Sequence, residues 1–257
     1  MGWHGRPVKC GSAHAGAGGE DEVRIAAVIP ALDAAPTLAE VVCRLRATLG
    51  GVPICVVDDG STDGTPRVAG ELGCMLVRHP QNYGKGAALR SGFLAVQRAA
   101  DLILTIDADG QHDPREVPRF LQRLRQSGLD IVVGDRMSRR GAMPRDRYLS
   151  NRLSSAVLSV VAGVAIRDSQ CGFRLFRAKV LEKISLTTTY FETESEFLVK
   201  AAWAGFKIGT VSIAATYASQ RSHISRWRDT LRFLKLMIAL LRERSGLGQT
   251  KCRTEKE

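Results

Sequence analysis

The sequence feature that most constrains the fold is an alternation of short apolar runs with segments of helical periodicity. The apolar run Arg24–Leu32 is followed by Thr37–Leu49, whose apolar residues recur every three or four positions, and then by the apolar run Pro53–Val57. Short apolar runs bounded by Pro and Gly are typical of buried strands, and the three-to-four spacing is typical of a helix. A strand, a helix and a strand joined by short links predict a βαβ unit, and therefore a parallel sheet.

The alternation continues along most of the chain and predicts an α/β fold. The expected architecture is a Rossmann-like, mostly parallel central sheet with helices on both faces. Further strands are predicted at Met75–Val77, from Leu102, at Asp130–Val133 and at Phe206–Ala214, and the segment Arg167–Phe176 is expected to lead into another strand. Further helices are predicted at 87–100, Pro114–Arg125, Ala178–Ile184 and Phe197–Trp203. We expect a disordered arm over 1–22, one domain over 23–225, a basic amphipathic helix over 226–245 and a polar tail over 246–257.

Charge and composition indicate the partners. The 257 residues carry a formal net charge of +11, which favours anionic partners such as phosphates, nucleotides, nucleic acid or an anionic membrane. Only 6% of the residues are aromatic, which argues against a surface that stacks single-stranded nucleic acid. No helix-turn-helix, zinc-finger or RNP-like signature is present, so no nucleic-acid partner is expected. A basic nucleotide- or nucleic-acid-binding protein without catalysis stays as the non-enzyme alternative.

The cysteines and the apolar segments indicate the compartment. None of the six cysteines has C-x-x-C spacing, and several lie inside apolar periodic segments, so we expect reduced, buried thiols. The first 22 residues contain no apolar core of a signal peptide, and no run reaches about 18 apolar residues. We therefore expect neither a leader peptide nor a transmembrane helix.

A pair of aspartates follows the predicted strand at Leu102, in the sequence TIDADGQHDP. Side chains at i and i+2 of an extended chain point the same way, so Asp107 and Asp109 are expected to project together. Open parallel sheets bind ligands at the carboxyl ends of their strands. Two hard oxygen ligands there suit Mg²⁺ or Mn²⁺ shared with a diphosphate, with Gln111 as a further oxygen ligand. Two solvated turn aspartates are the alternative.

Two further loops are candidate ligand sites. Asp58 and Asp59 follow the second strand and are placed to accept hydrogen bonds from a base or a ribose, while Ser61 or Thr65 is expected to cap the next helix. Lys85 stands between two glycines before a helix, which allows the backbone to approach a polar ligand closely.

Basic and acidic residues cluster later in the chain. Six arginines lie between 136 and 152: Arg136, Arg139, Arg140, Arg145, Arg147 and Arg152. They are either a solvated loop or phosphate ligands; we favour phosphate binding by Arg136 and by one or two of Arg145, Arg147 and Arg152. Glu192, Glu194 and Glu196 open a helix, where acidic side chains favour the helix dipole.

Two segments are candidates for contact with a membrane. Leu153–Ile166 is either a core helix or a helix lying at the membrane interface. The final helix, about Trp227–Arg244, has a basic stripe (Arg228, Arg232, Lys235 and Arg242) and an apolar face. This pattern favours a membrane surface over a helix of an oligomer, and an oligomer stays possible.

In combination, these motifs resemble those of a known family. In chain order they are IPALD, VVDDGSTDGT, NYGKGAAL, TIDADGQHDP, DSQCGFRLF and FETESEFL. The set resembles family 2 glycosyltransferases of the GT-A fold, and within them the polyprenyl-phosphate branch that includes dolichol-phosphate mannosyltransferase. The resemblance covers about residues 24–241. It implies an inverting, metal-dependent transfer of a sugar from a GDP- or UDP-sugar to a lipid phosphate, by a protein peripherally bound to the cytoplasmic face of the cell membrane.

The resemblance also implies roles for individual residues. Pro30, Asp58 and Lys85 would surround the nucleotide, and Asp107, Asp109 and Gln111 match a metal-binding D-x-D-x-Q pattern. Arg136 matches an arginine that faces the donor and acceptor phosphates, and Arg221 is a further phosphate contact. From the arginine cluster we add Arg147 as an acceptor-phosphate ligand. Where the family commonly has Tyr-Asn-Glu after the first strand, this chain has Leu32-Asp33-Ala34. Leu32, Asp33 and Asp59 are therefore donor-site candidates whose base preference is open.

The acceptor decides whether a catalytic base is needed. A phosphate monoester is largely ionised at neutral pH, because its second pKa is about 6, and can attack without a base. A hydroxyl acceptor would need one of Glu192, Glu194 and Glu196, with Glu194 the candidate that we carry forward. The predicted catalytic residues are therefore Asp109, Arg136 and Glu194. Transfer to a hydroxyl of a glycan or small molecule is the alternative within the family. A sugar nucleotidyltransferase is a further enzyme alternative, but this sequence lacks the Gly-rich signature that such enzymes usually have after the first strand.

Overall fold

The computed structural model describes residues 23–138, 143–214 and 226–254, and within them a seven-stranded sheet. The strand order is β3-β2-β1-β4-β6-β5-β7. The strands are β1 (Ile25–Ala31), β2 (Ile54–Asp58), β3 (Met75–Arg78), β4 (Leu102–Thr105), β5 (Ile131–Asp135), β6 (Arg174–Arg177) and β7 (Ile208–Ser212). β6 runs antiparallel to both β4 and β5, and all other pairs are parallel. The predicted α/β fold with a mostly parallel central sheet is confirmed.

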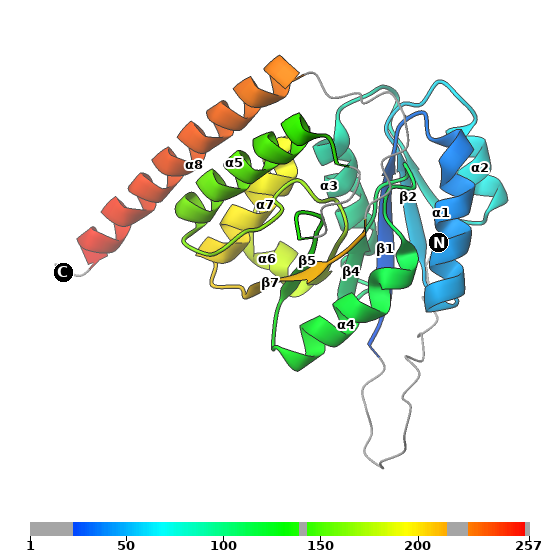
Figure 1. Ribbon diagram of the computed structural model, residues 1–257, viewed down its shortest axis with the longest axis horizontal. Helices are drawn as coiled ribbons and strands as arrows, with labels where there is room; N and C mark the ends of the chain where they lie inside the picture. The colour runs from blue at the N-terminus through cyan, green and yellow to red at the C-terminus, as the bar shows by residue number, and fades with distance from the viewer. Residues whose placement is uncertain (1–22, 139–142, 215–225, 255–257) are drawn as a thin grey trace, which may run out of the picture.

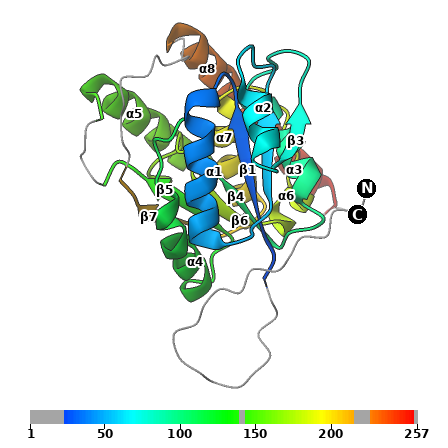
Figure 2. The same cartoon turned by 90° about the vertical axis from the view of Figure 1, so that its right-hand side faces the viewer.

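Helices cover both faces of this sheet. They are α1 (Ala35–Leu49), α2 (Thr65–Glu71), α3 (Lys85–Val96), the 3-10 turn η1 (Pro114–Glu116), α4 (Val117–Gln126), α5 (Arg145–Ala162), α6 (Lys179–Lys183), α7 (Glu192–Trp203) and α8 (Arg226–Thr254). Figures 1 and 2 show α1 and α4 on one side of the sheet and α3 on the other, with α7 packed beside α3. The buried side of α1 consists of the apolar residues at the predicted spacing, such as Leu38, Val42 and Leu45.

One predicted loop is largely a helix. Arg145, Arg147 and Arg152 lie in α5, which begins after Pro144, so the interpretation of 136–152 as a loop is wrong over its second half. The helix is extended because Asn151 and Ser155 are buried against the segment 168–169, a contact that local sequence does not reveal. The inner side of α5 is core, with Leu158 fully buried.

The end of the chain also differs from the prediction. Helix α8 continues to Thr254, through most of the segment predicted to be a polar tail. The predicted arm over 1–22 lies outside the described residues. Among the helices that the structure describes, none combines the length and the hydrophobicity that a membrane span requires.

The sheet topology fixes where a site can form. β1 pairs in parallel with β2 and with β4, so the carboxyl ends of these three strands meet at one edge. The chain leaves that edge at Leu32, at Asp59 and at Ile106. Open α/β sheets bind ligands in the crevice outside the carboxyl ends of their strands, at the point where the strand order reverses, and here the order reverses between β1 and β4.

Candidate active site

The two aspartates of the D-x-D sequence follow the end of β4. Asp109 lies in a turn rather than in the extended chain from which the sequence analysis argued, so the joint projection of the two side chains stays a prediction. Asp107 is partly exposed, and its carboxylate lies against the backbone of Gly172: a Cβ on Gly172 would lie 2.5 Å from Oδ2 and 2.6 Å from Oδ1. Thr105, the last residue of β4, donates a hydrogen bond to the carbonyl of Gly172 (2.7 Å). Gly172 is therefore a positional requirement for Asp107, which the sequence analysis did not identify.

Lys85, the first residue of α3, joins Asp107 to Glu194. Its Nζ lies 2.7 Å from Asp107 Oδ1 and 3.0 Å from Glu194 Oε1, and its side chain is only 15% exposed. Burial alone would lower the pKa of Lys85, but the two carboxylates raise it above its ordinary value. Lys85 is therefore a permanent positive charge at the end of β4.

The electrostatics of Asp107 and Asp109 differ. Burial alone would raise the pKa of Asp107, but Lys85 and His112 hold it below its ordinary value. Burial and the neighbouring charge of Asp107 raise the pKa of Asp109, whose Oδ1 accepts a hydrogen bond from the Gln111 backbone N–H (3.0 Å). Two close carboxylates whose charges repel one another favour a bound cation.

The side chains at this site could supply some, but not all, of the ligands of a divalent cation. No group of three His, Cys, Asp or Glu side chains with metal-binding geometry occurs in the described part of the chain. Asp107 and Asp109 supply hard oxygen ligands from one loop, and Gln111 lies two residues further on, half-buried. Mg²⁺ commonly binds through one or two carboxylates and completes its coordination with water and substrate phosphates, so this donor set suits a cation shared with a diphosphate.

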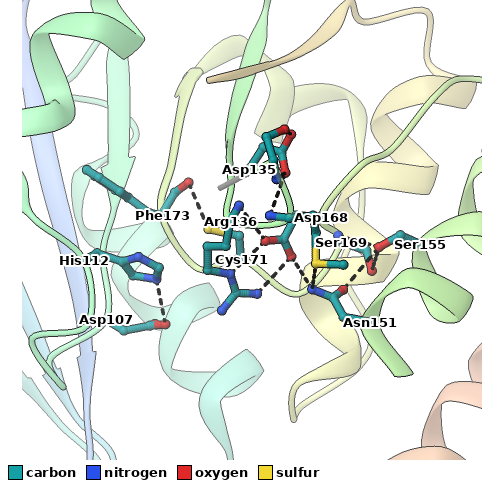
Figure 3. A network of polar contacts seen from close by, with 12 residues as sticks. Asp107, His112, Asp135, Arg136, Asn151, Ser155, Asp168, Ser169, Cys171 and Phe173 are labelled. Carbon is teal, nitrogen blue, oxygen red and sulfur yellow. Dashed lines mark hydrogen bonds and ion pairs between the residues drawn. The ribbon is translucent and has the colours of Figure 1, made fainter. Parts of the chain in front are cut away.

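Arg136, which follows β5, is held by a buried carboxylate. Figure 3 shows its guanidinium against Asp168, to which Nε donates at 2.7 Å and the second terminal nitrogen at 2.9 Å. Asn151 of α5 donates to the same carboxylate (2.8 Å), and Asp168 has no exposed surface. Burial alone would raise the pKa of Asp168, but Arg136 and Asn151 hold it below its ordinary value. The predicted arginine is thus fixed in orientation by an aspartate that the sequence analysis passed over.

His112 is a buried neighbour of the D-x-D pair. Its Nε2 lies 4.0 Å from Asp107 Oδ2, and its ring packs against Phe173 with 5.5 Å between ring centroids (Figure 3). Its Nδ1 is buried with no hydrogen-bond partner in the described structure. Burial lowers its pKa to about 4, so the imidazole is neutral at physiological pH. Only its position three residues after Asp109 pointed to it in the sequence.

Asp58 and Asp59 are buried, and their carboxylate oxygens accept hydrogen bonds from neighbouring backbone and side-chain groups. Asp58 accepts from the backbone of Ser61 (3.0 Å) and from Arg78 (3.2 Å). Asp59 accepts from the backbone of Tyr83 and Gly84 and contacts His79 Nδ1 at 2.6 Å. Both carboxylates therefore shape the loops around Lys85, and their predicted role in nucleotide binding stays a prediction.

The chain after β1 is also organised by local bonds. Pro30 is buried in β1 opposite Val57, and Leu32 is half-buried at the strand's end. Asp33 is exposed, has a φ of 49°, and accepts a hydrogen bond from the backbone of Thr62 (2.8 Å). It thereby fastens the first loop to the second.

The predicted capping of α2 by Ser61 or Thr65 is wrong. Ser61 Oγ accepts from the Asp33 backbone N–H, and Thr65 Oγ1 accepts from that of Ala34, so both hydroxyls hold the start of α1 instead. Thr37 of α1 in turn donates to the carbonyl of Ala108 (2.6 Å) and so connects this region to the D-x-D pair.

The three glutamates at the start of α7 have different surroundings. Glu194 is buried at the site and pairs with Lys85. Glu196 is 1% exposed and accepts from the backbone N–H groups and hydroxyls of Thr187 and Thr188 and from Lys200. The hydrogen bonds of Glu196 therefore stabilise the fold. Glu192 is half-buried. Among the interactions of these three glutamates in the described structure, only that of Glu194 is with a residue that contacts Asp107.

The other predicted phosphate ligands are only partly placed. Of these, Arg152 lines a cavity of about 210 Å³, together with Tyr148, Arg167, Asp135 and Ser138. Asp135 directly precedes Arg136 in the sequence. Arg147 is half-buried in α5, and Arg221 lies outside the described residues.

Comparison with protein families identifies the domain. The family model described as "Glycosyl transferase family 2" matches residues 26–185, more than half of the chain. The match covers β1 through α6, and so contains Lys85, Asp107, Asp109 and Arg136.

Similar proteins agree with that match, and a solved structure shares the fold. A polyprenol monophosphomannose synthase from Mycolicibacterium smegmatis is 29% identical over 215 residues, which cover 79% of this chain and 80% of that protein. A UDP-N-acetylglucosamine–dolichyl-phosphate N-acetylglucosaminyltransferase from Methanococcus voltae is 29% identical over 216 residues (75% and 85%). The crystal structure of glucosyl-3-phosphoglycerate synthase from Mycobacterium tuberculosis, in complex with Mn²⁺, UDP and phosphoglyceric acid, aligns with a TM-score of 0.67 at 20% identity (87% and 79%).

Proposed function

The chain belongs to glycosyl transferase family 2 and is a glycosyltransferase, and on that premise we propose that it transfers a sugar from a nucleotide-sugar donor to a polyprenyl-phosphate-type lipid acceptor, with inversion, at the cytoplasmic face of a membrane. The observation that carries the proposal is the grouping of Asp107, Asp109, Lys85 and Arg136 at one sheet edge. The named activities of two relatives support the lipid-phosphate acceptor.

The donor site is assigned to the ends of β1, β2 and β4. The nucleotide is proposed to lie beside Pro30, Leu32, Asp33, Asp58 and Asp59, with its diphosphate toward Asp107. Mg²⁺ or Mn²⁺, held by Asp107 and Asp109 with Gln111 near, would supply a Lewis acid that stabilises the charge of the leaving diphosphate. A structural neighbour binds Mn²⁺ with UDP, which supports this assignment.

The positive side chains of this protein stabilise the same charge. Lys85 remains protonated because two carboxylates raise its pKa, and Arg136 is preorganised by Asp168. In the transfer, an acceptor phosphate oxygen forms the new bond to the anomeric carbon while the bond to the diphosphate oxygen breaks. Charge already fixed at the leaving group lowers the barrier without reorganisation.

A phosphate acceptor removes the need for a base. Its oxygen is ionised, the product is a phosphodiester, and no proton has to move. In this case Glu194 keeps Lys85 in place rather than accepting a proton. Transfer to a hydroxyl remains the second candidate, and Glu194 is the observation that favours it, because a buried carboxylate within the site is placed to accept a proton.

A donor and acceptor panel tests the proposal. GDP- and UDP-sugars are incubated with a polyprenyl phosphate or with a polyprenol, in Mg²⁺, Mn²⁺ or EDTA, and products are identified by mass. We expect a glycosyl phosphodiester only with the phosphate and a metal, and loss of turnover by at least about 100-fold in Asp109→Asn. Product from the alcohol alone would establish the hydroxyl reaction, and nucleotide binding without any product would contradict catalysis.

A further inference from the structure

Helices α5 and α8 each carry an exposed row of aliphatic side chains. On α5 the row consists of Leu149, Leu153, Val157 and Val160, which are 63%, 69%, 37% and 80% exposed, and Val164 continues it past the helix end. On α8 it consists of Leu231, Leu234, Ile238 and Leu241, each between 50% and 53% exposed. Scattered exposed aliphatic residues are ordinary, but rows on neighbouring helices mark an interaction surface.

The two rows lie on neighbouring helices. Both α5 and α8 pack on α7, and Figure 1 shows all three on the same side of the molecule. Arg244 of α8 donates to the carbonyl of Val161 in α5 (3.0 Å), so the two helices are in contact. Leu241 precedes Arg244 by three residues and therefore lies on the same side of α8, toward α5.

Basic residues flank the two rows. Arg145 and Arg152 are exposed on α5, and Lys235 and Arg242 are exposed on α8. Basic helices with an aliphatic side are suited to the surface of an anionic membrane, where aliphatic groups enter the acyl boundary and cations meet the headgroups. A symmetric dimer through the same rows would bring the four cations of one copy close to those of the other, which is unfavourable.

The surface is also connected to the proposed active site. Arg232 of α8 stacks on the ring of Tyr190, with 3.5 Å from its guanidinium carbon to the ring centroid. Tyr190 packs against Gly84, which precedes Lys85. These contacts connect the first part of α8 to the loop that precedes Lys85.

From these observations we propose that the exposed rows of α5 and α8 form one membrane-docking face for an anionic lipid surface. Its orientation relative to the site rests on the proposed function, but binding itself does not. In the sequence, the final helix and Leu153–Ile166 were separate candidates for membrane contact, and Leu153–Ile166 was expected to be either a core helix or an interfacial one. In the structure, α5 has both a buried side and an exposed aliphatic side.

The test measures binding to vesicles in the absence of donor and acceptor, so it stands apart from the test of catalysis. The full chain is sedimented with vesicles of phosphatidylcholine containing phosphatidylglycerol, and with phosphatidylcholine alone. We compare the double variants Leu153→Asp/Val160→Asp on α5 and Leu234→Asp/Ile238→Asp on α8 with Leu94→Asp. Leu94 is 71% exposed but lies on α3, so Leu94→Asp shows the effect of one such substitution outside the face.

We expect each double variant to weaken binding to anionic vesicles by about tenfold or more, since each removes two aliphatic groups and adds two negative charges. Leu94→Asp should bind as the parent does, and added salt should weaken parental binding. Melting curves and circular dichroism confirm that the variants fold, as expected for exposed positions.

Three results would overturn the proposal. The first is unchanged vesicle binding in either double variant, which would exclude that helix from the face. The second is a parent that fails to bind anionic vesicles. The third is a parent that sediments as a dimer and double variants that sediment as monomers, which would make the face a self-association surface.

Discussion

The Lys85 ammonium lies 2.7 Å from Oδ1 of Asp107, so the first aspartate of the D-x-D pair is neutralised by a side chain from the start of α3. Glu194 Oε1 contacts the same ammonium at 3.0 Å. In the proposed function a divalent cation would bind Asp107, and Lys85 would keep its contact with Glu194 and present its charge to a phosphate. Without a cation, the pairing places a positive charge against both carboxylates at the acidic edge of the sheet.

Replacement of Lys85 tests this pairing. Lys85→Met leaves two partly or fully buried carboxylates without their cation, and we expect the free energy of unfolding to fall by about 3 kcal/mol. Mn²⁺ should restore more stability to Lys85→Met than to the parent, because the ammonium no longer competes for Asp107. Urea unfolding with and without Mn²⁺ measures both effects.

The control for that experiment is Lys183→Met, which changes an exposed lysine at the end of α6. It should alter neither the stability nor the response to Mn²⁺. Equal behaviour of Lys85→Met and Lys183→Met would refute the pairing.

Gly172→Ala tests the position of Asp107. The added Cβ would lie 2.5 Å from Oδ2, so the carboxylate must move. We expect Mn²⁺ affinity, measured by calorimetry in the presence of UDP or GDP, to fall by about tenfold or more. Gly70→Ala is the matched control, because nothing lies within 4 Å of its Cβ and it is in the exposed part of α2. It should gain about 0.5–1 kcal/mol in stability and leave Mn²⁺ binding as it is.

The two buried glutamates of α7 should respond differently to amide substitution. Glu196→Gln removes an acceptor for the Thr187 and Thr188 donors and the charge opposite Lys200, so we expect a loss of about 1–3 kcal/mol in stability and unchanged turnover per folded molecule. Glu194→Gln should keep turnover of a phosphate acceptor within about tenfold, since no base is needed. A fall of about 100-fold or more, with folding intact, would instead identify Glu194 as the base for a hydroxyl.

Asp168→Asn should show a stability effect that depends on pH. Although burial alone would raise the pKa of Asp168, Arg136 and Asn151 hold it below the value in the unfolded chain. The stabilisation is therefore fully present above the unfolded pKa, about 3.9, and is lost as pH falls through the lower folded-state pKa. We expect the variant to be about 3 kcal/mol less stable between pH 5 and 7.

Urea unfolding from pH 3 to pH 7 provides that comparison. The difference between parent and variant should be constant above about pH 5 and should shrink below about pH 4. A difference that stays the same down to pH 3 would show that the charge of Asp168 is not what stabilises the Arg136 segment.

The strands and the D-x-D pair were predictable because local chemistry specifies them. Apolar runs bounded by Pro and Gly predicted β1 and β2 to within about one residue at each end, and an apolar run predicted the start of β4 at Leu102. The placement of Asp107 just after a strand followed from its sequence neighbours. The start of α5 was not predictable in this way. Its first turns are held by Asn151 and Ser155, which bond to residues 14 to 17 positions away.

The sequence by itself determined an α/β domain whose acidic residues follow its strands, because hydrophobic periodicity and strand ends are local properties. Only the tertiary structure decided which charges meet. It inserted β6 antiparallel between β4 and β5, which brought Gly172 against Asp107, and it paired Arg136 with Asp168 across 32 positions of the chain. Such pairings arise from the packing of distant segments around a shared core, and no local pattern in the sequence encodes them.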